Sequence, residues 1–207
     1  MGKRSLKAVV FDAFGTLCEL RHKKRPFTDL ARLCSDRRKM LEAVMTRPLG
    51  LSAAAGEFAS AAIDIESLEA DLNLELDSMC LFSDAMMVLG RLRDAGIKVG
   101  IVSNLAEPYA KRLLDIFPVH AEHAWSFEVG CLKPDPRIFS VICAKIGVSP
   151  SEAIMVGDTF SADYLGATAF GMRAIHLDRA GQSSISVPTI NTLDELVGLL
   201  GLSSTNG

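Results

Sequence analysis

The 207-residue chain has few of the residues on which disulfide-rich and zinc-stapled proteins depend. It contains five cysteines, at positions 18, 34, 80, 131 and 143, and no two of them have the CxxC spacing. An odd count without paired spacing argues against a disulfide framework or a zinc site, and it favours reduced thiols.

The chain also lacks a strong charge of one sign and a long apolar run. Its formal net charge is −3, so no global electrostatic field indicates a nucleic-acid partner. The apolar run that ends before Asp12 is too short for a signal sequence or a membrane span, and no other segment is long enough. We therefore expect a cytoplasmic protein without a nucleic-acid or membrane partner. No feature of the sequence sets its oligomeric state.

What is present is typical of a globular domain, because 49% of the residues are hydrophobic and 23% are charged. The length allows one sizeable core, with or without a smaller inserted unit. Four continuous apolar runs are typical of buried strands in a parallel sheet. They are Lys7–Phe11, Lys98–Val102, Ala153–Val156 and Met172–Leu177.

Helical patterns precede the later strands and close the chain. They cover Asp84–Ala95, Asp135–Ile146, Ser161–Phe170 and Asn191–Leu200. We expect Gly96 to end the first of these helices. We expect Asp135 to cap the second, with Pro136 in its first turn. Strands that alternate with helices predict a doubly wound α/β sheet, in which ligands bind at the carboxyl ends of the strands.

Residues 17–83 interrupt this alternation, because they carry helical patterns but no convincing buried strand. We interpret them as a helical insertion, with residues 1–16 and 84–207 forming the core. Leu17–Pro48 holds nine Lys/Arg and four Asp/Glu, whereas Leu49–Ser83 holds seven Asp/Glu and no Lys/Arg. One interpretation is that neighbouring helices attract each other through their solvated faces. The other is that the basic half faces an anionic substrate.

Polar residues suited to phosphate or carboxylate chemistry follow three of the predicted strands and precede one helix. In chain order they are Asp12 to Thr16, Ser103-Asn104, Lys133-Pro134, and Gly157-Asp158 with Asp163. Each feature alone is common in turns and caps. Their joint occurrence at strand ends predicts one site at the carboxyl edge of the sheet.

This set of motifs resembles that of the haloacid dehalogenase superfamily, and the resemblance covers nearly the whole chain. Asp12 matches the nucleophile of the first motif, and Thr16 matches the residue after that motif's glycine. Ser103 matches the hydroxyl of the second motif, with Asn104 beside it. Lys133 matches the lysine of the third motif.

The remaining motif and the insertion extend the resemblance. Asp158 and Asp163 match the paired carboxylates of the fourth motif. The insertion at 17–83 has the position of the helical cap that one subgroup of the family carries. The resemblance therefore implies a Rossmann-like core with an inserted helical cap, and an active site between the two.

These residues suit hydrolysis through a covalent intermediate. A carboxylate such as Asp12 is a competent nucleophile toward phosphorus or an activated carbon, and the intermediate divides one hard step into two. We expect Lys133 to hold Asp12 and the transferred group by charge. We expect Ser103 and backbone N–H groups to bind the developing negative oxygens. Thr16 and Asn104 are further expected substrate-binding residues.

A magnesium site is also expected. Asp12 and Asp158 supply the one or two carboxylates that Mg²⁺ prefers, and the backbone carbonyl of Phe14 is a third expected ligand. The ion would offset the repulsion between an anionic nucleophile and an anionic phosphate. Asp163 is a supporting residue, which either orients Lys133 or interacts with a helix dipole as a first-turn acid.

Phe14 departs from the pattern of the family's phosphatases, which usually carry a second aspartate at this position. That aspartate protonates the leaving alkoxide and later activates water, and phenylalanine cannot transfer a proton. The family's dehalogenases typically have an aromatic residue here, since a halide leaves without being protonated. Gly157-Asp158 favours a phosphatase instead, because the family's dehalogenases work without metal and lack this Gly-Asp pair at the beginning of the fourth motif.

We therefore favour a Mg²⁺-dependent phosphatase that acts on a small phosphorylated metabolite with a good leaving group, such as an acyl or aryl phosphate. One alternative is a metal-independent 2-haloacid dehalogenase. Its halide-binding arginine would come from Arg25, Arg32, Arg38 or Arg47 of the insertion. Another alternative is a weakly active binding or regulatory module. The expected partner is a small anionic substrate.

Overall fold

A six-stranded parallel sheet forms the centre of the computed structural model, which describes residues 6–60, 63–117 and 119–202. In spatial order its strands are β5, β4, β1, β6, β7 and β8. Their bounds are β1 (Ala8–Phe11), β4 (Lys98–Ser103), β5 (Glu122–Trp125), β6 (Ala153–Gly157), β7 (Arg173–Leu177) and β8 (Thr189–Ile190). Each pairing between neighbours is parallel, which confirms the predicted α/β class.

Strand β1 lies at the point where the strand order reverses, with β4 on one side and β6 on the other. Phe11 is in register with Ile101 on β4 and with Val156 on β6. The carboxyl ends of the three strands are therefore nearly level, so Asp12 and Ser103 lie at one edge of the sheet. Open α/β sheets bind ligands at such a switch point.

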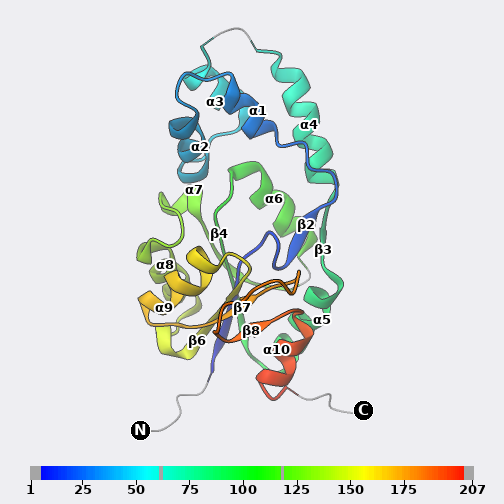
Figure 1. Ribbon diagram of the computed structural model, residues 1–207, viewed down its shortest axis with the longest axis vertical. Coiled ribbons are helices and arrows are strands. Elements are labelled where there is room, and N and C mark those ends of the chain that lie inside the picture. The colour runs from blue at the N-terminus through cyan, green and yellow to red at the C-terminus, as the bar shows by residue number, and fades with distance from the viewer. Residues whose placement is uncertain (1–5, 61–62, 118, 203–207) are drawn as a thin grey trace.

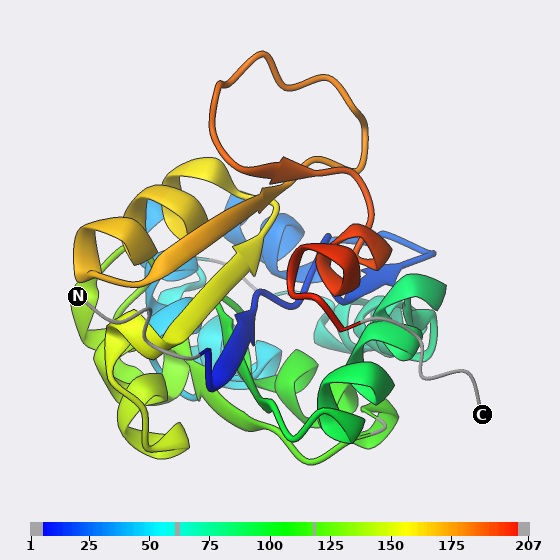
Figure 2. The same cartoon turned by 90° about the horizontal axis from the view of Figure 1, so that it is seen from below.

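Helices cover both faces of the sheet, as Figure 2 shows from below. Val9 and Phe11 face one apolar cluster, and Ala8 and Val10 face another, since side chains alternate along a strand. All four are fully buried, which explains why β1 has a continuous apolar sequence. The first cluster contains α5 (Ser83–Asp94), α6 (Glu107–Ile116) and α10 (Asp194–Leu199), and the second contains α8 (Pro136–Ile146) and α9 (Gly166–Phe170).

The predicted core helices are present, with changed bounds. Asp135 caps α8 as expected, because its side chain accepts a hydrogen bond from the Arg137 amide at 2.9 Å. The helix predicted over 161–170 is divided, since a π-helical segment, η2 (Phe160–Leu165), precedes α9. Two short elements complete the core: α7 (Ser126–Val129) after β5, and a 3₁₀ turn, η1 (Pro150–Glu152), before β6.

A second unit of four helices lies beyond the carboxyl ends of the strands (Figure 1). Its helices are α1 (Pro26–Arg32), α2 (Arg37–Thr46), α3 (Leu51–Phe58) and α4 (Ile65–Asp77). They enclose an apolar cluster that includes Leu30, Met40 and Ala54, each fully buried. Residues 61–62 of the predicted insertion, and 1–5, 118 and 203–207 of the predicted core, lie outside the described residues.

Two short strands that were not predicted connect this unit to the core. β2 (Cys18–Leu20) and β3 (Met79–Leu81) pair antiparallel, with Cys18 opposite Leu81 and Leu20 opposite Met79. Three residues are too few to show strand periodicity, and the partners are about 60 positions apart. The pairing brings the two ends of the insertion together beside the loop that follows β1.

The two oppositely charged halves of the insertion are in contact. Lys24 Nζ lies 3.1 Å from an Asp71 oxygen, and Arg47 Nη2 lies 2.7 Å from a Glu57 oxygen. These two contacts join residues that flank α1 and α2 to α4 and α3, as the first interpretation of the charge pattern predicts. Both pairs are partly exposed, so each is worth only about 0–1 kcal/mol.

The five cysteines all lie within the described residues and are free thiols. Cys18, Cys131 and Cys143 are buried. A search of residues 6–60, 63–117 and 119–202 for a helix long and apolar enough to cross a membrane finds none.

Candidate active site

Asp12 and Lys133 form a buried ion pair at the carboxyl end of β1. Lys133 Nζ lies 2.6 Å from Asp12 Oδ1 and 2.6 Å from Asp163 Oδ1, and the three side chains are almost fully buried. Burial alone would lower the pKa of Lys133, but the two carboxylates outweigh it and raise that pKa above its ordinary value. Lys133 is therefore a charged ammonium that fixes the Asp12 carboxylate in place.

Asn104 holds the backbone of Lys133. Its side-chain amide donates to the Lys133 carbonyl at 3.1 Å, and its carbonyl oxygen accepts from the Lys133 amide at 2.7 Å. The Lys133-Pro134 peptide bond is cis. These contacts fix the position of the Lys133 backbone, and substrate binding by Asn104 stays a prediction.

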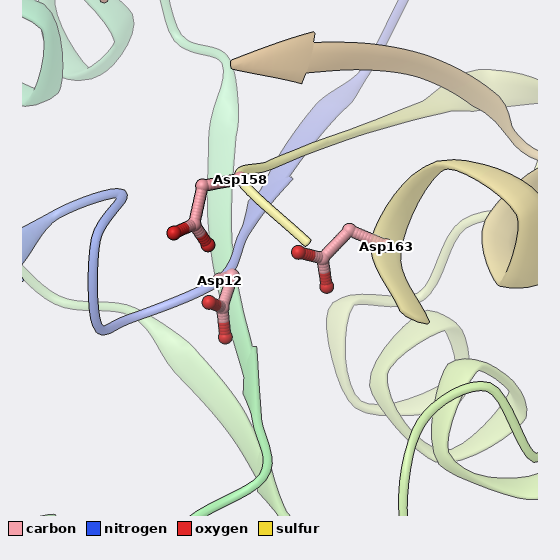
Figure 3. Close-up of side chains that lie close together, drawn as sticks. All are labelled: Asp12, Asp158 and Asp163. Atoms are coloured by element: carbon pink, nitrogen blue, oxygen red, sulfur yellow. The ribbon is translucent and has the colours of Figure 1, made fainter. Parts of the chain in front are cut away.

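Asp163 approaches the site from η2 (Figure 3). Its Oδ2 accepts a hydrogen bond from the Thr159 amide at 3.0 Å, while its Oδ1 contacts Lys133. Gly157 permits this approach, because a Cβ there would collide with the Asp163 carboxylate. Burial raises the pKa of Asp163 to about 6, against the lowering effect of Lys133. The contact with Lys133 brings Asp163 within reach of the orienting role, which stays a prediction.

Asp158 brings a third carboxylate to the site, and the oxygens of Asp12, Asp158 and Asp163 lie within 4.8 Å of one another. Although Asp158 as a whole is exposed, its carboxylate packs against Gly15, where a Cβ would collide with it. The pKa of Asp158 is raised by lost hydration and then by the negative charge of Asp12. Three carboxylates around one ammonium leave a net charge of about −2 if all are ionised, which suits a divalent cation.

The oxygens differ in their availability to such a cation. Asp163 uses both of its oxygens, on Lys133 and on the Thr159 amide. Asp12 uses Oδ1 on Lys133. Its Oδ2 and the Asp158 carboxylate are therefore the oxygens left available to a metal, and ligation by this pair stays a prediction.

The predicted hydroxyl residues lie at different depths. Ser103 ends β4 and is 2% exposed, next to the edge where Asp12 lies. Thr16 is completely buried, and its Oγ1 has no hydrogen-bond partner among the described residues. The Thr16 carbonyl accepts from Arg179. Substrate binding by either hydroxyl stays a prediction.

Arg179, which was not predicted, holds the loop after β1. Its guanidinium donates to the carbonyls of Gly15 and Thr16, at 3.0 and 2.7 Å. It also makes a bidentate pair with Asp84, at 2.8 and 3.1 Å, and lies 3.9 Å over the Phe82 ring. Arg179 therefore connects the loop after β1 to the start of α5. No local pattern around residue 179 indicates these contacts.

A cavity of about 470 Å³ opens beside the loop after β1. Phe14 and Asn104 line it from the core, and α1, α2 and α4 line it from the insertion. Among the four arginines considered for halide binding, Arg25 is the one in its lining. The ring of Phe14 packs edge-on against Tyr109, with centroids 5.8 Å apart.

Glu75 of α4 is a second residue that was not predicted. It is 2% exposed and also lines the cavity. Its Oε1 accepts from the Arg25 amide at 2.7 Å, and its Oε2 accepts from the Tyr109 hydroxyl at 2.5 Å. Burial, and then Glu75, raise the pKa of Tyr109, so this phenol stays protonated.

The chain matches a family model described as haloacid dehalogenase-like hydrolase over residues 6–171. It is 36% identical to the glyceraldehyde 3-phosphate phosphatase of Methanopyrus kandleri over 101 residues, 47% of this chain and 43% of that protein. It is 27% identical to (S)-2-haloacid dehalogenase 4A of Burkholderia cepacia, over 97% of both chains. A solved HAD phosphatase from Thermococcus onnurineus is 28% identical, with a TM-score of 0.65, over 95% of this chain and 98% of that one. The chain spans about half the length of the curated phosphatase relatives that it matches.

Proposed function

The chain belongs to the haloacid dehalogenase-like hydrolases, and we propose that it is a Mg²⁺-dependent phosphatase for a small phosphorylated metabolite with a good leaving group. The observation that carries the proposal is the position of Asp158. Its carboxylate lies within 4.8 Å of the Asp12 carboxylate, and the contacts of Lys133 are with Asp12 and Asp163. A dehalogenase that works without metal has no evident use for this extra negative charge.

Asp12, Asp158 and the Phe14 carbonyl would hold the ion. When bound, Mg²⁺ would neutralise the carboxylates and the phosphate, so that one anion can approach the other. In this proposal residues 17–83 act as a cap over a catalytic core of residues 1–16 and 84–207. The partner is then a small anionic molecule in the cytoplasm, and neither a nucleic acid nor a membrane.

The reaction has two steps. In the first, a carboxylate oxygen of Asp12 attacks phosphorus, and the bond from phosphorus to the leaving oxygen breaks, with its electron pair going to that oxygen. In the second, water attacks the phosphorus, the bond to Asp12 breaks, and the proton from water passes to solvent. Lys133 and the Ser103 hydroxyl stabilise the negative charge on the phosphoryl oxygens.

Phe14 restricts the range of good substrates. Because its side chain holds no proton, the leaving group departs without acid assistance from this position. Acyl and aryl phosphates release stable anions and are therefore the expected substrates. Alkyl phosphates release a basic alkoxide and should react slowly.

A metal-independent 2-haloacid dehalogenase is the second candidate, and Phe14 is the observation that favours it. A halide leaves without a proton, so the absence of an acid at Phe14 would not slow a dehalogenase. The likeness to the haloacid dehalogenase of Burkholderia cepacia also extends over nearly the full chain. In that case Arg25, at the cavity wall, is the arginine placed to receive the halide.

One panel of substrates separates these candidates. Acetyl phosphate, an aryl phosphate, an alkyl phosphate and 2-chloropropionate are each incubated with and without EDTA. The phosphatase proposal predicts phosphate release from the first two, abolished by EDTA. Chloride release from 2-chloropropionate alone, insensitive to EDTA, would overturn it. No turnover of any of the four would favour a binding or regulatory module.

A further inference from the structure

The cavity beside Phe14 is lined by close chain neighbours of the proposed nucleophile and of Ser103. Phe14 lies two residues after Asp12, and Asn104 directly follows Ser103. A phosphate bound at Asp12 therefore has this cavity as the space for the organic part of the substrate. Its volume of about 470 Å³ lies within the usual range for small-molecule sites, roughly 300–1,000 Å³.

The walls of the cavity are mostly apolar and partly aromatic. Phe14 and Phe27 both pack around Tyr109, with ring centroids 5.8 and 6.2 Å from it, and Leu41 and Met45 line the same space. Aromatic rings and a methionine thioether favour a flat apolar ligand.

Two of the polar lining residues are already committed to protein contacts. Both oxygens of Glu75 accept hydrogen bonds, from the Arg25 amide and the Tyr109 hydroxyl. The side chain of Asn104 is occupied on both sides by the backbone of Lys133. Fewer hydrogen-bond partners therefore remain for a ligand rich in hydroxyls, and each hydroxyl left unpaired would lower its affinity. The cavity therefore disfavours sugar phosphates.

Lys23 and Arg25 add positive charge to this apolar space. Both line the cavity and are exposed, and no carboxylate among the described residues forms an ion pair with either. The neighbouring Lys24, in contrast, pairs with Asp71. Arg25 has a left-handed backbone, with φ of 60°, that L residues rarely adopt. The hydrogen bond that its backbone N–H donates to Glu75 Oε1 holds it in this conformation at the cavity wall.

From these observations, and resting on the proposed phosphatase function, we infer the class of substrate. The organic part is an apolar ring that carries a second anionic group, such as a carboxylate, away from the phosphate. The ring lies in the cavity, against the wall that Phe14, Phe27 and Tyr109 form. The second anion binds Lys23 and Arg25.

Binding to the Asp12→Asn chain tests the inference without dependence on turnover. Three ligands with similar linkage to phosphate are compared by titration calorimetry in Mg²⁺: 4-carboxybenzyl phosphate, benzyl phosphate and glucose 6-phosphate. We expect the affinity to fall in that order. 4-Carboxybenzyl phosphate should bind about threefold to tenfold more tightly than benzyl phosphate, since partly exposed ion pairs contribute about 0.2–1 kcal/mol each.

The double substitution Lys23→Gln/Arg25→Gln is then added to Asp12→Asn. It should remove the difference in affinity between 4-carboxybenzyl phosphate and benzyl phosphate. Arg38→Gln, added in the same way, removes a positive charge from an exposed position of α2 outside the cavity lining, and should leave the difference intact. Glucose 6-phosphate binding as tightly as benzyl phosphate would overturn the inference. So would a carboxylate preference that survives the double substitution, or no binding of any ligand. Phosphate release from acetyl phosphate by the wild-type chain tests the proposed function separately.

Discussion

Replacement of Arg179 by methionine should loosen the loop after β1, which carries the proposed nucleophile, and destabilise the fold. The guanidinium makes hydrogen bonds to two carbonyls of that loop, a bidentate pair with Asp84, and a stacking contact with Phe82. Methionine keeps much of the apolar contact but none of the donors. Residues 15 and 16 would then be free to move relative to Asp12.

The size of the effect follows from the burial of the pair. The side chain of Asp84 is 11% exposed and that of Arg179 is 24% exposed. Breaking a fully buried pair costs about 3–5 kcal/mol. Because Arg179 is partly exposed and Asp84 keeps its bond from the Leu193 amide, we expect a loss of about 2–3 kcal/mol. Displacement of the catalytic loop should also lower kcat about tenfold to a hundredfold.

Urea unfolding followed by circular dichroism measures the loss. Arg137→Met is the matched control, since Arg137 pairs with Asp135 at an exposed position and should cost no more than about 1 kcal/mol. A double-mutant cycle with Asp84→Asn should give a coupling energy of at least about 1 kcal/mol. Equal destabilisation by Arg179→Met and Arg137→Met, or a coupling energy near zero, would refute the reasoning.

Three further predictions concern the carboxylates and Phe14. Burial raises the pKa of Asp163 to about 6, above its unfolded value of about 3.9, so its contribution to stability is lost as pH rises through 6. Urea unfolding in EDTA therefore compares the free energy of unfolding of Asp163→Asn with that of wild type. The difference should shift in favour of the variant by about 2 kcal/mol as the pH rises from 4 to 7, and a difference that does not change with pH would contradict this. Asp158→Ala should weaken Mg²⁺ binding in titration calorimetry; equal binding by both proteins, or none by wild type at millimolar Mg²⁺, counts against the metal site. Wild type should hydrolyse aryl phosphates about 10²–10⁴-fold faster than alkyl phosphates, and Phe14→Asp should narrow that gap; equal wild-type rates would show that another residue supplies the proton.

The strands nearest the site were predictable because they are buried on both faces. β1, β4, β6 and β7 therefore have continuous apolar sequences, and the polar residues that follow β1, β4 and β6 had to meet at one edge. β5 escaped prediction because Glu122 and His123, at the edge of the sheet, are partly exposed and polar. β2 and β3 escaped because each depends on a partner distant in the sequence.

The same distinction applies to the site. Asp12, Lys133 and Asp163 were predictable from motifs at strand and helix ends, and the structure brings them into contact. Arg179 and Glu75 were not, because their importance comes from partners 34 to 164 positions away along the chain. Pairings at that range leave no local signal in one sequence.

The central claim is that Asp12 attacks the substrate of a Mg²⁺-dependent phosphatase, and one comparison tests it most directly. Release of phosphate from acetyl phosphate is measured in Mg²⁺ with wild type and with Asp12→Asn, after circular dichroism has shown that both chains are folded. Asp115→Asn, at an exposed position of α6, controls for the loss of an aspartate elsewhere. We expect wild-type and Asp115→Asn turnover to be alike, and Asp12→Asn turnover to be lower by at least about 10³-fold, because the covalent step is lost. Turnover by Asp12→Asn at close to the wild-type rate would contradict the account.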